Sequence, residues 1–323
     1  MKTAGFIGLG LIGRKRLSAS LELDMQINFL CDSDKKVAKL VDNAIFFESI
    51  ESIDREILSK TEFIFLSLPH SLVLPTLKKI APYAKNILIE KPLGLNLSEA
   101  IEIRDISKQY ELRIATGFNY RYLKNIQKLK TLIDSGFFGK IFEVDMRLEH
   151  GGRPGMEKEW KLKKDAAGGG VTIDPGVHLF DLCFFLFRPS FKVLFKDLKR
   201  KFWESDVEDS LCAILENNDS IFKINVNILS WKNNFEISIH GSEGYAKLTG
   251  RGGNYGNIKI EFCKKWFWLE EDLTINKIDY GSEDNSFQQE TRDFILNPHS
   301  DHISMLSDGV KVHQVLDSLY NES

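Results

Sequence analysis

The stretch GFIGLGLIGRKRL, residues 5–17, decides the fold. Gly8, Gly10 and Gly13 follow the spacing G-x-G-x-x-G, between an apolar run that predicts a strand and a pattern that predicts a helix. A tight turn requires the first glycine, close approach of a pyrophosphate requires the second, and packing of the helix on the strand requires the third. The free N–H groups of the helix start favour phosphate. We therefore expect a dinucleotide loop; a glycine-rich turn without a ligand is the alternative.

Asp32 refines the expected ligand. It follows the apolar run INFLC, residues 27–31, nineteen positions after Gly13. A carboxylate at this place accepts hydrogen bonds from the adenosine ribose hydroxyls and repels a 2′-phosphate, so the sequence favours NAD over NADP. NADP stays open because basic residues lie nearby at positions 14–16, 35 and 36. Asp32 could at the same time close an Asx turn or cap the next helix.

The bulk properties indicate an ordinary folded protein with two domains. The chain has 323 residues, more than the ~250 to 300 at which single cores usually divide. Its 43 basic and 46 acidic side chains leave a net charge of -3, which gives no electrostatic reason to expect nucleic acid or an anionic membrane as a partner. The four cysteines are scattered, without the spacing of a zinc knuckle or a disulfide framework, and fit a reducing cytoplasm.

The N-terminal run, residues 1–13, has the apolar character of a signal peptide. The glycines within it and the basic RKR at positions 14–16 argue against that reading. No apolar run reaches the ~18 residues needed to span a bilayer. We therefore expect a cytoplasmic protein.

The hydrophobic period divides the chain near residue 120. Before it, apolar runs such as EFIFLSL, residues 62–68, are interleaved with helical patterns such as DKKVAKLVD, residues 34–42, which predicts a parallel sheet buried on both faces. After it, runs such as IFEVDMRLE, residues 141–149, alternate apolar and polar positions, which predicts an antiparallel sheet with one covered face. We expect an α/β domain with a doubly wound parallel sheet over residues 1–120. An α+β domain with a large, open, mainly antiparallel sheet would occupy residues 121–323, and its uncovered face could meet a second copy in a homodimer or homotetramer.

Two further motifs stand at the carboxyl ends of predicted parallel strands, the edge at which open α/β sheets bind ligands. These are SLPH, residues 67–70, and EKP, residues 90–92. Lys91 precedes a proline, so its backbone is pushed toward an extended form and the bond itself could be cis. A surface lysine at an ordinary turn is the alternative. The residues that we expect at the cofactor are Gly8, Gly10, Leu11, Ile12, Gly13, Asp32, Ser67, Pro69, His70, Glu90 and Lys91.

The stretch GGGVTIDPGVHLFDLCFFLF, residues 168–187, predicts the start of an apolar helix. Asp174 suits the N-cap and Pro175 the first helical position, which would put Asp174 and His178 on one face. A purely structural helix start leaves the histidine unexplained. The positive end of the helix dipole disfavours an imidazolium, so His178 would tend to be neutral and able to accept a proton. The preceding glycines would let the chain approach a cofactor closely.

With these residues in view, the chain resembles the Gfo/Idh/MocA oxidoreductases, which include glucose-fructose oxidoreductase and inositol dehydrogenase. The resemblance covers nearly the whole chain and rests on the order and spacing of several loose motifs. These are GFIGLGLIG (5–13), CDSD (31–34), SLPH, EKPLGLN (90–96), GFNYRY (117–122), LIDSGFFGKI (132–141) and GGGVTIDPGVHLFDL (168–182). The resemblance implies a Rossmann domain, a mixed domain with an open sheet, and hydride exchange between nicotinamide and a hydroxyl or ketone of a sugar or cyclitol.

The resemblance also implies site residues. The family's catalytic lysine corresponds to Lys91, and its Asp and His pair to Asp174 and His178. Asn119 and Arg121 resemble the stretch that lines the site near the nicotinamide and the substrate. We hypothesise that Lys91 stabilises the developing alkoxide, His178 acts as general base, and Asp174 supports the pair.

The segment EHGGRPGMEKEW, residues 149–160, is more elaborate than the generic pattern and resembles members that are thought to act in bacterial surface-glycan or nucleotide-sugar pathways. We expect His150, Arg153 and Trp160 to contact the substrate. The planar fork of Arg153 could bind a phosphate or carboxylate of that substrate. A mobile glycine loop with a solvated arginine is the alternative.

Three alternatives to a sugar dehydrogenase stay open. The first is a cyclitol dehydrogenase, the second a NAD-binding member that uses the cofactor without net redox change, and the third a sensor that kept the fold and lost the chemistry. His299 and His302 beside Asp301 could mimic metal ligands, but NPHSDH, residues 297–302, is more typical of a polar loop before a final helix over residues 307–323. We expect no metal.

Overall fold

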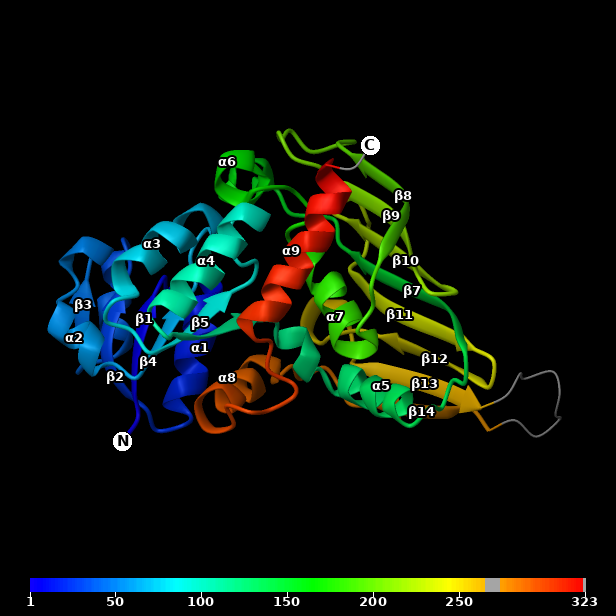
Figure 1. The fold of residues 1–323 in the computed structure, drawn as a ribbon, viewed down its shortest axis with the longest axis horizontal. Coiled ribbons are helices and arrows are strands. Elements are labelled where there is room, and N and C mark those ends of the chain that lie inside the picture. The colour runs from blue at the N-terminus through cyan, green and yellow to red at the C-terminus, as the bar shows by residue number, and fades with distance from the viewer. Residues whose placement is uncertain (265–273, 322–323) are drawn as a thin grey trace. The chain divides into compact units, whose positions relative to one another are not determined.

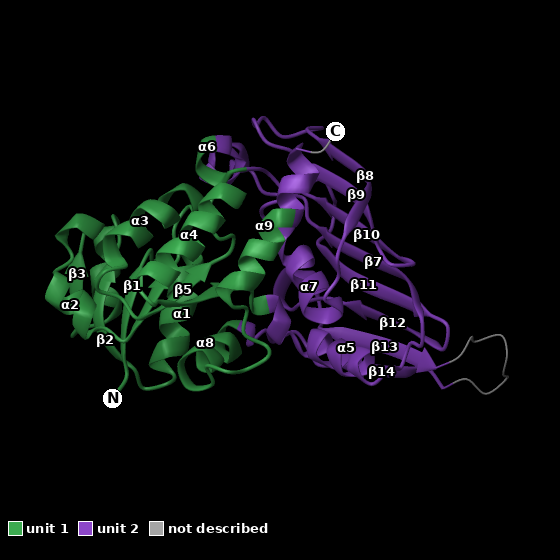
Figure 2. Ribbon diagram, in the orientation of Figure 1, with its two compact units in different colours: residues 1–119, 165–168, 287–314 green, residues 120–164, 169–286, 315–323 purple. Residues whose placement is uncertain are grey.

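A computed structural model describes residues 1–264 and 274–321 of the chain (Figure 1). The chain divides into two compact units (Figure 2). Unit 1 comprises residues 1–119, 165–168 and 287–314, and unit 2 comprises residues 120–164, 169–286 and 315–323. Residues 265–273 and 322–323, which fall in unit 2, are outside the described residues. The division predicted from sequence, at residue 120, differs in that residues 165–168 and 287–314 pack with the first unit.

Unit 1 is built on a six-stranded parallel sheet with the order β3-β2-β1-β4-β5-β6. Its strands are β1 (Thr3–Ile7), β2 (Gln26–Cys31), β3 (Ile45–Phe47), β4 (Phe63–Leu66), β5 (Asn86–Glu90) and β6 (Arg113–Gly117). The helices of the same part of the chain are α1 (Leu11–Leu21), α2 (Arg55–Lys60), α3 (Val73–Ile80), α4 (Leu97–Gln109) and the short α6 (Lys164–Ala167). The predicted doubly wound parallel sheet is therefore confirmed. A helix predicted from DKKVAKLVD, residues 34–42, forms only a short 3-10 segment, Lys35–Leu40.

Helix α8 (Ser286–Leu296) and most of helix α9 (Leu306–Asn321) complete the unit. Phe294 of α8 explains why this late part of the chain packs on the parallel sheet, since its ring lies edge-on to the rings of Phe63 and Phe65 at centroid distances of 5.6 and 5.8 Å. A contact between aromatic rings so far apart in the chain cannot be predicted from the pattern of neighbouring residues. The last helix was predicted over residues 307–323, whose final two positions lie outside the described residues.

Unit 2 is built on an eight-stranded sheet with the order β14-β13-β12-β11-β7-β10-β9-β8. Its strands are β7 (Ile141–Glu149), β8 (Lys192–Lys199), β9 (Ser210–Asn217), β10 (Ser220–Asn227), β11 (Asn234–Gly241), β12 (Gly244–Thr249), β13 (Lys259–Lys264) and β14 (Asn276–Asp279). Among the described strand pairs of this eight-stranded sheet, only β7 and β10 are parallel, which confirms the mainly antiparallel prediction.

The alternating pattern of these strands buries one face of the sheet. Val144, Met146 and Leu148 of β7 are completely buried, and their neighbours in sequence are not. Helices α5 (Lys124–Asp134) and α7 (Val177–Phe187) pack against this sheet, as Figure 1 shows. The helices therefore provide the cover that the period-two pattern requires.

Candidate active-site residues

The surroundings of Gly8, Gly10 and Gly13 explain why each of these positions is a glycine. Gly8 has φ of +85°, and a Cβ atom added there would lie 2.3 Å from the carbonyl oxygen of Ser67. A Cβ on Gly13 would lie 2.0 Å from the carbonyl oxygen of Gly8, so close packing excludes a side chain. A Cβ on Gly10, which precedes α1, would meet no atom within 4 Å. The N-terminus of α1 is thus open at Gly10, and this space fits a phosphate group of a dinucleotide.

Asp32 lies directly beside this turn. One carboxylate oxygen, Oδ2, accepts a hydrogen bond from the backbone N–H of Leu9 at 2.6 Å, and Oδ1 accepts one from Asp34 at 2.8 Å. The Asx-turn reading and placement beside the glycine turn are therefore both correct. Two nearby basic residues have other partners, since Arg14 donates to the carbonyl of Leu9 at 2.9 Å and Lys35 pairs with Glu48 at 2.7 Å. Neither geometry favours a 2′-phosphate.

The strand ends of unit 1 share one edge of the parallel sheet. Ser67 follows β4, and its N–H donates to the carbonyl of Ile7 at the end of β1, at 2.9 Å. Lys91 follows β5, which pairs with β4 in parallel, and the Lys91–Pro92 bond is cis, as the sequence allows. Pro69 is half-buried and Leu11 is 76% exposed at the start of α1, next to the half-buried Ile12.

His70 is almost completely buried in unit 1. It is 3% exposed, and its Nδ1 lies 2.8 Å from the carbonyl oxygen of Ala167, which belongs to the same unit. The contact holds α6 to the end of β4. A contact between His70 and the cofactor stays a prediction.

In unit 2, the segment before α7 differs from the predicted helix start. Helix α7 begins at Val177 with Gly176 before it, and the Asp174–Pro175 bond is cis. Asp174 is therefore not the N-cap and Pro175 is not the first helical residue, so both predictions were wrong. The chain instead turns compactly, with the N–H of Asp174 donating to the carbonyl of Gly170 at 2.9 Å. His178 still lies in the first turn of α7, as predicted.

A buried carboxylate holds this segment in place. Glu208, 8% exposed, accepts hydrogen bonds from the N–H groups of Gly170 and Thr172, each at 3.0 Å. The hydroxyl of Tyr320, near the end of α9, donates to the same carboxylate at 2.7 Å. Burial is the main reason that the pKa of Tyr320 is raised, which keeps it a hydrogen-bond donor. No sequence motif pointed to Glu208 or Tyr320.

The carboxylate of Asp174 pairs with Lys161, a residue that sequence reasoning missed. Lys161 Nζ lies 2.6 Å from Asp174 Oδ2, and the Asp174 side chain is only 10% exposed. The negative charge of Asp174 is the largest reason that the pKa of Lys161 is raised. Lys161 stands in the run KLKK, residues 161–164, and nothing in the sequence distinguished it from its neighbours.

His178 is buried against Tyr120, the second residue that was missed. The two rings stack with centroids 3.8 Å apart and planes within 5°, and each residue is 5% exposed. Burial raises the pKa of Tyr120, so its hydroxyl stays protonated. The guanidinium of Arg251 lies 5.2 Å from the Tyr120 ring and 3.7 Å from the Tyr255 ring. His178 is thus held rigidly by an aromatic neighbour.

Arg121 is committed to a structural contact within unit 2. Its guanidinium forms a bidentate, buried ion pair with Asp181 of α7, with Nε 2.9 Å from Oδ2 and Nη2 2.5 Å from Oδ1. Asn119, two residues earlier, is 4% exposed. The predicted contacts of Asn119 and Arg121 with substrate stay predictions.

The segment after β7 places three predicted substrate contacts. The Nδ1 atom of His150 accepts a hydrogen bond from the N–H of Gly152 at 3.0 Å, and burial is the main reason that the pKa of His150 is lowered. Arg153, whose side chain is 61% exposed, pairs with Glu159 at 2.6 Å. Trp160 is half-buried next to Lys161. After burial, the charge of Asp174 acts most strongly on the pKa of His150 and raises it, whereas the charges of Arg251, Lys161 and Arg153 lower it.

Two further properties concern the described residues only. Residues 1–264 and 274–321 contain no group of three or more His, Cys, Asp or Glu side chains arranged to hold a metal ion. No helix within the same residues is both long and apolar enough to cross a membrane.

Comparisons with known proteins give the chain its family. A model described as "Oxidoreductase family, NAD-binding Rossmann fold" matches residues 2–118, and one described as "GFO/IDH/MocA C-terminal domain" matches residues 126–247. Glucose-6-phosphate 3-dehydrogenase of Bacillus subtilis is 27% identical over 195 residues, which cover 59% of this chain and 55% of that protein. D-xylose dehydrogenase of Paenarthrobacter nicotinovorans is 30% identical over 152 residues, 45% of this chain and 39% of that protein. The matched part thus spans about half the length of these relatives or less.

Solved structures show the same fold over the whole chain. Levoglucosan dehydrogenase in complex with NADH and levoglucosan has a TM-score of 0.81 at 18% identity, covering 100% of this chain and 98% of that one. The WlbA dehydrogenase of Bordetella pertussis, in complex with NADH and UDP-GlcNAcA, has a TM-score of 0.79 at 17% identity, covering 99% and 95%. At these identities the likeness establishes fold alone. Together with the two matched domains, it shows that the chain belongs to the Gfo/Idh/MocA family of oxidoreductases, with an NAD-binding Rossmann fold in its first part.

Proposed function

We propose that this chain is an NAD-dependent dehydrogenase or reductase that acts on a secondary hydroxyl or ketone of a sugar, with a nucleotide-linked sugar as the favoured substrate. The observation that carries the proposal lies within unit 1. Lys91 follows the carboxyl end of β5 on the same sheet edge as the open glycine turn after β1. In doubly wound sheets dinucleotides bind at this edge, so we expect Lys91 to lie close to the bound cofactor.

Each residue has a defined task in the proposed reaction. Bound NAD supplies the hydride acceptor at its nicotinamide ring. The Lys91 ammonium donates a hydrogen bond to the substrate oxygen as negative charge develops on it. The imidazole of His178 accepts the hydroxyl proton, and its stacking on Tyr120 limits the orientations that the ring can take. Asp174 supports the pair, with Lys161 fixing one of its carboxylate oxygens.

The choice of a nucleotide-linked sugar rests on charge. Three cations, Arg153, Lys161 and Arg251, lie close enough to His150 to lower its pKa, and they are opposed there by the carboxylate of Asp174. Phosphate oxygens of a nucleotide-linked sugar match these cations, and the guanidinium of Arg153 can bind them through two N–H groups. A neutral cyclitol would gain nothing from these cations. A role in surface-glycan biosynthesis would follow from a nucleotide-linked substrate.

The first experiment is a fluorescence titration with NADH and NADPH, followed by a screen of cyclitols, free sugars and nucleotide-linked sugars with the preferred cofactor. Lys91→Met is compared with Lys108→Met, which removes an exposed lysine of α4 in the same unit. We expect Lys91→Met alone to abolish turnover. Full activity of Lys91→Met would refute the proposed reaction.

The same material separates the remaining alternatives. Arg153→Ala should lower turnover on nucleotide-linked sugars more than on free sugars, whereas equal losses on both would remove Arg153 from phosphate recognition. A member that uses the cofactor without net redox change would keep NAD through purification and give no net reduction. An NAD-binding sensor would bind NADH and turn over none of the substrates.

A homodimer or homotetramer remains part of the proposal. The open face of the sheet in unit 2 carries ion pairs such as Lys223 with Glu143 and Lys247 with Glu236, at 2.5 and 2.9 Å. This charged face suits a polar subunit contact. Light scattering during size-exclusion chromatography measures the oligomeric state, and a monomer at micromolar concentration would contradict the expectation.

A further inference from the structure

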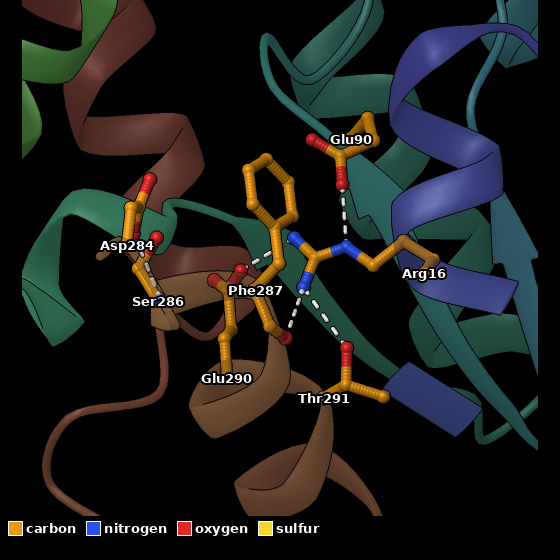
Figure 3. Close-up of polar contacts among 7 residues, drawn as sticks. All are labelled: Arg16, Glu90, Asp284, Ser286, Phe287, Glu290 and Thr291. Carbon is orange, nitrogen blue, oxygen red and sulfur yellow. Dashed lines mark hydrogen bonds and ion pairs between the residues drawn. The ribbon is translucent and has the colours of Figure 1, made fainter. Parts of the chain in front are cut away.

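Arg16, three residues after the last glycine of the turn, is completely buried in unit 1 (Figure 3). Its Nε donates to Glu90 Oε1 at 2.7 Å, and its Nη2 is bound by Glu290 Oε2. Its Nη1 faces the hydroxyl of Thr291 at 3.2 Å, and the guanidinium carbon lies 4.8 Å from the ring centroid of Phe287. All faces of the guanidinium are therefore in contact with protein.

This one side chain connects three elements that are distant in sequence. Arg16 belongs to α1, whose N-terminus is the open phosphate position. Glu90 is the last residue of β5 and immediately precedes Lys91. Glu290 comes from α8, far along the chain. The contact thus ties the cofactor helix to the strand end that carries Lys91.

The fold reserves space for the Glu90 carboxylate. A Cβ atom added to Gly117, at the end of the neighbouring strand β6, would lie 2.8 to 2.9 Å from the three atoms of that carboxylate. A side chain at position 117 would push the carboxylate away from Arg16. The Nε donor of Arg16 and the space left by Gly117 therefore both favour the same orientation of the Glu90 carboxylate.

Stability alone is a poor explanation for this arrangement. Buried ion pairs are often no more stabilising than apolar residues of the same volume, because desolvation offsets their attraction. What they do supply is directional geometry. The fork of an arginine can bind two carboxylates in fixed directions at once, which a lysine ammonium cannot do.

We propose that Arg16 is a positioning residue for Lys91, acting through Glu90 to fix the turn from which the lysine side chain leaves the sheet. The inference rests on the proposed function for the role of Lys91 in turnover. The positioning itself is a property of unit 1 and has its own measurement.

The test compares Arg16→Met with Arg113→Met. Arg113 is a matched control because it also contacts α8, through a 2.9 Å bond to the Phe294 carbonyl and a 4.7 Å approach to the Phe294 ring, but forms no ion pair with Glu90. Hydrogen exchange followed by mass spectrometry reports on residues 88–95. The turn there includes the bond from the Gly94 N–H to the Pro92 carbonyl at 3.0 Å.

We expect Arg16→Met to raise the exchange rate over residues 88–95 by about tenfold or more, and Arg113→Met to leave it within about threefold. With the substrate found by the screen, kcat should fall by about 10- to 100-fold in Arg16→Met while the Kd for NADH changes by less than about threefold, because a misplaced lysine affects reaction more than cofactor binding. Unchanged exchange over 88–95, or equal increases in both variants, would overturn the proposal.

Two further variants keep the test valid if Arg16→Met does not fold. Arg16→Lys retains the charge and loses the fork, so exchange over 88–95 should still rise. Glu290→Gln leaves the bond from Arg16 to Glu90 in place, so exchange there should stay at the native rate. The opposite order of these two variants would also refute the inference. If Lys91→Met proves fully active while the exchange results hold, the proposed reaction fails and the positioning stands.

Discussion

His313 of α9 is a buried histidine whose protonation opposes folding. It is 2% exposed, and its pKa is lowered from 6.5 to about 4, chiefly by burial and then by the charge of His70, while a hydrogen bond with the backbone of Leu93 works in the opposite direction. Its Nε2 atom is buried without a hydrogen-bond partner among the described residues. An imidazolium at this position would be a buried charge without compensation.

The lowered pKa predicts a loss of stability in mild acid. Between pH 6.5 and about 4 the unfolded chain binds a proton at position 313 that the folded chain does not, so the free energy of unfolding falls as the pH falls. The stability is fully present above pH 6.5. The gap between the two pKa values corresponds to about 3 kcal/mol in total, of which about 2 kcal/mol is lost at pH 5.

Urea unfolding followed by far-ultraviolet circular dichroism at pH 7 and pH 5 measures this loss. In His313→Asn, the amide can replace the donor to Leu93 without titrating, so the variant should lose about 2 kcal/mol less than the native protein between the two pH values. His299→Asn is the control, because His299 is an exposed histidine of the same unit and its removal should leave the pH dependence unchanged. The same pH dependence in His313→Asn and the native protein would refute the reasoning.

Three other changes have expected outcomes. His178→Ala should lower kcat by about 10² to 10⁴ with NADH binding retained, as steady-state kinetics and fluorescence titration can measure, and a loss of less than about threefold would remove it as the general base. Gly13→Ala should lower the free energy of unfolding by about 1 to 3 kcal/mol, because its Cβ would meet the Gly8 carbonyl at 2.0 Å. Gly10→Ala should keep the melting temperature and weaken NADH binding. Equal changes of melting temperature and of NADH affinity in the two variants would contradict the geometry. Glu208→Ala should lower the free energy of unfolding by about 1 to 3 kcal/mol through the lost acceptor for Gly170 and Thr172, and chemical denaturation showing no change would disprove that role.

Local sequence pattern predicted most of the fold. The glycine spacing, the apolar runs of the first domain and the period-two strands of the second each depend on neighbours along the chain, and each is confirmed. The strands that were not predicted, β3, β6, β8 and β14, are short or lack clean alternation. β8, for example, leaves Leu194 and Phe195 45% and 50% exposed, so its residues give no period-two signal.

Features that depend on distant residues could not be predicted from the sequence. Arg16 looked like one of several basic residues near the cofactor, and only α8 and β5 together show that it is buried between two carboxylates. The helix start at Asp174 was misread because the sequence DPGVH also satisfies the rules for a cap and a first turn. The chain forms a compact turn here in place of the predicted helix start. Glu208, from elsewhere in the chain, supplies the acceptor for the N–H groups of Gly170 and Thr172 in this turn.

The contacts of unit 2 differ between its two predicted catalytic residues, Asp174 and His178. One oxygen of Asp174 is held by the Lys161 ammonium, so a proton taken up there would have to displace an ion pair in a largely buried position. His178 is instead stacked on the phenol ring of Tyr120, with the planes of the two rings within 5°. The roles of His178 as general base and of Asp174 as its support stay predictions, which the kinetics of His178→Ala test. The family resemblance gave the two residues as a pair, and their partners from other segments, Lys161 and Tyr120, could not be predicted from the sequence.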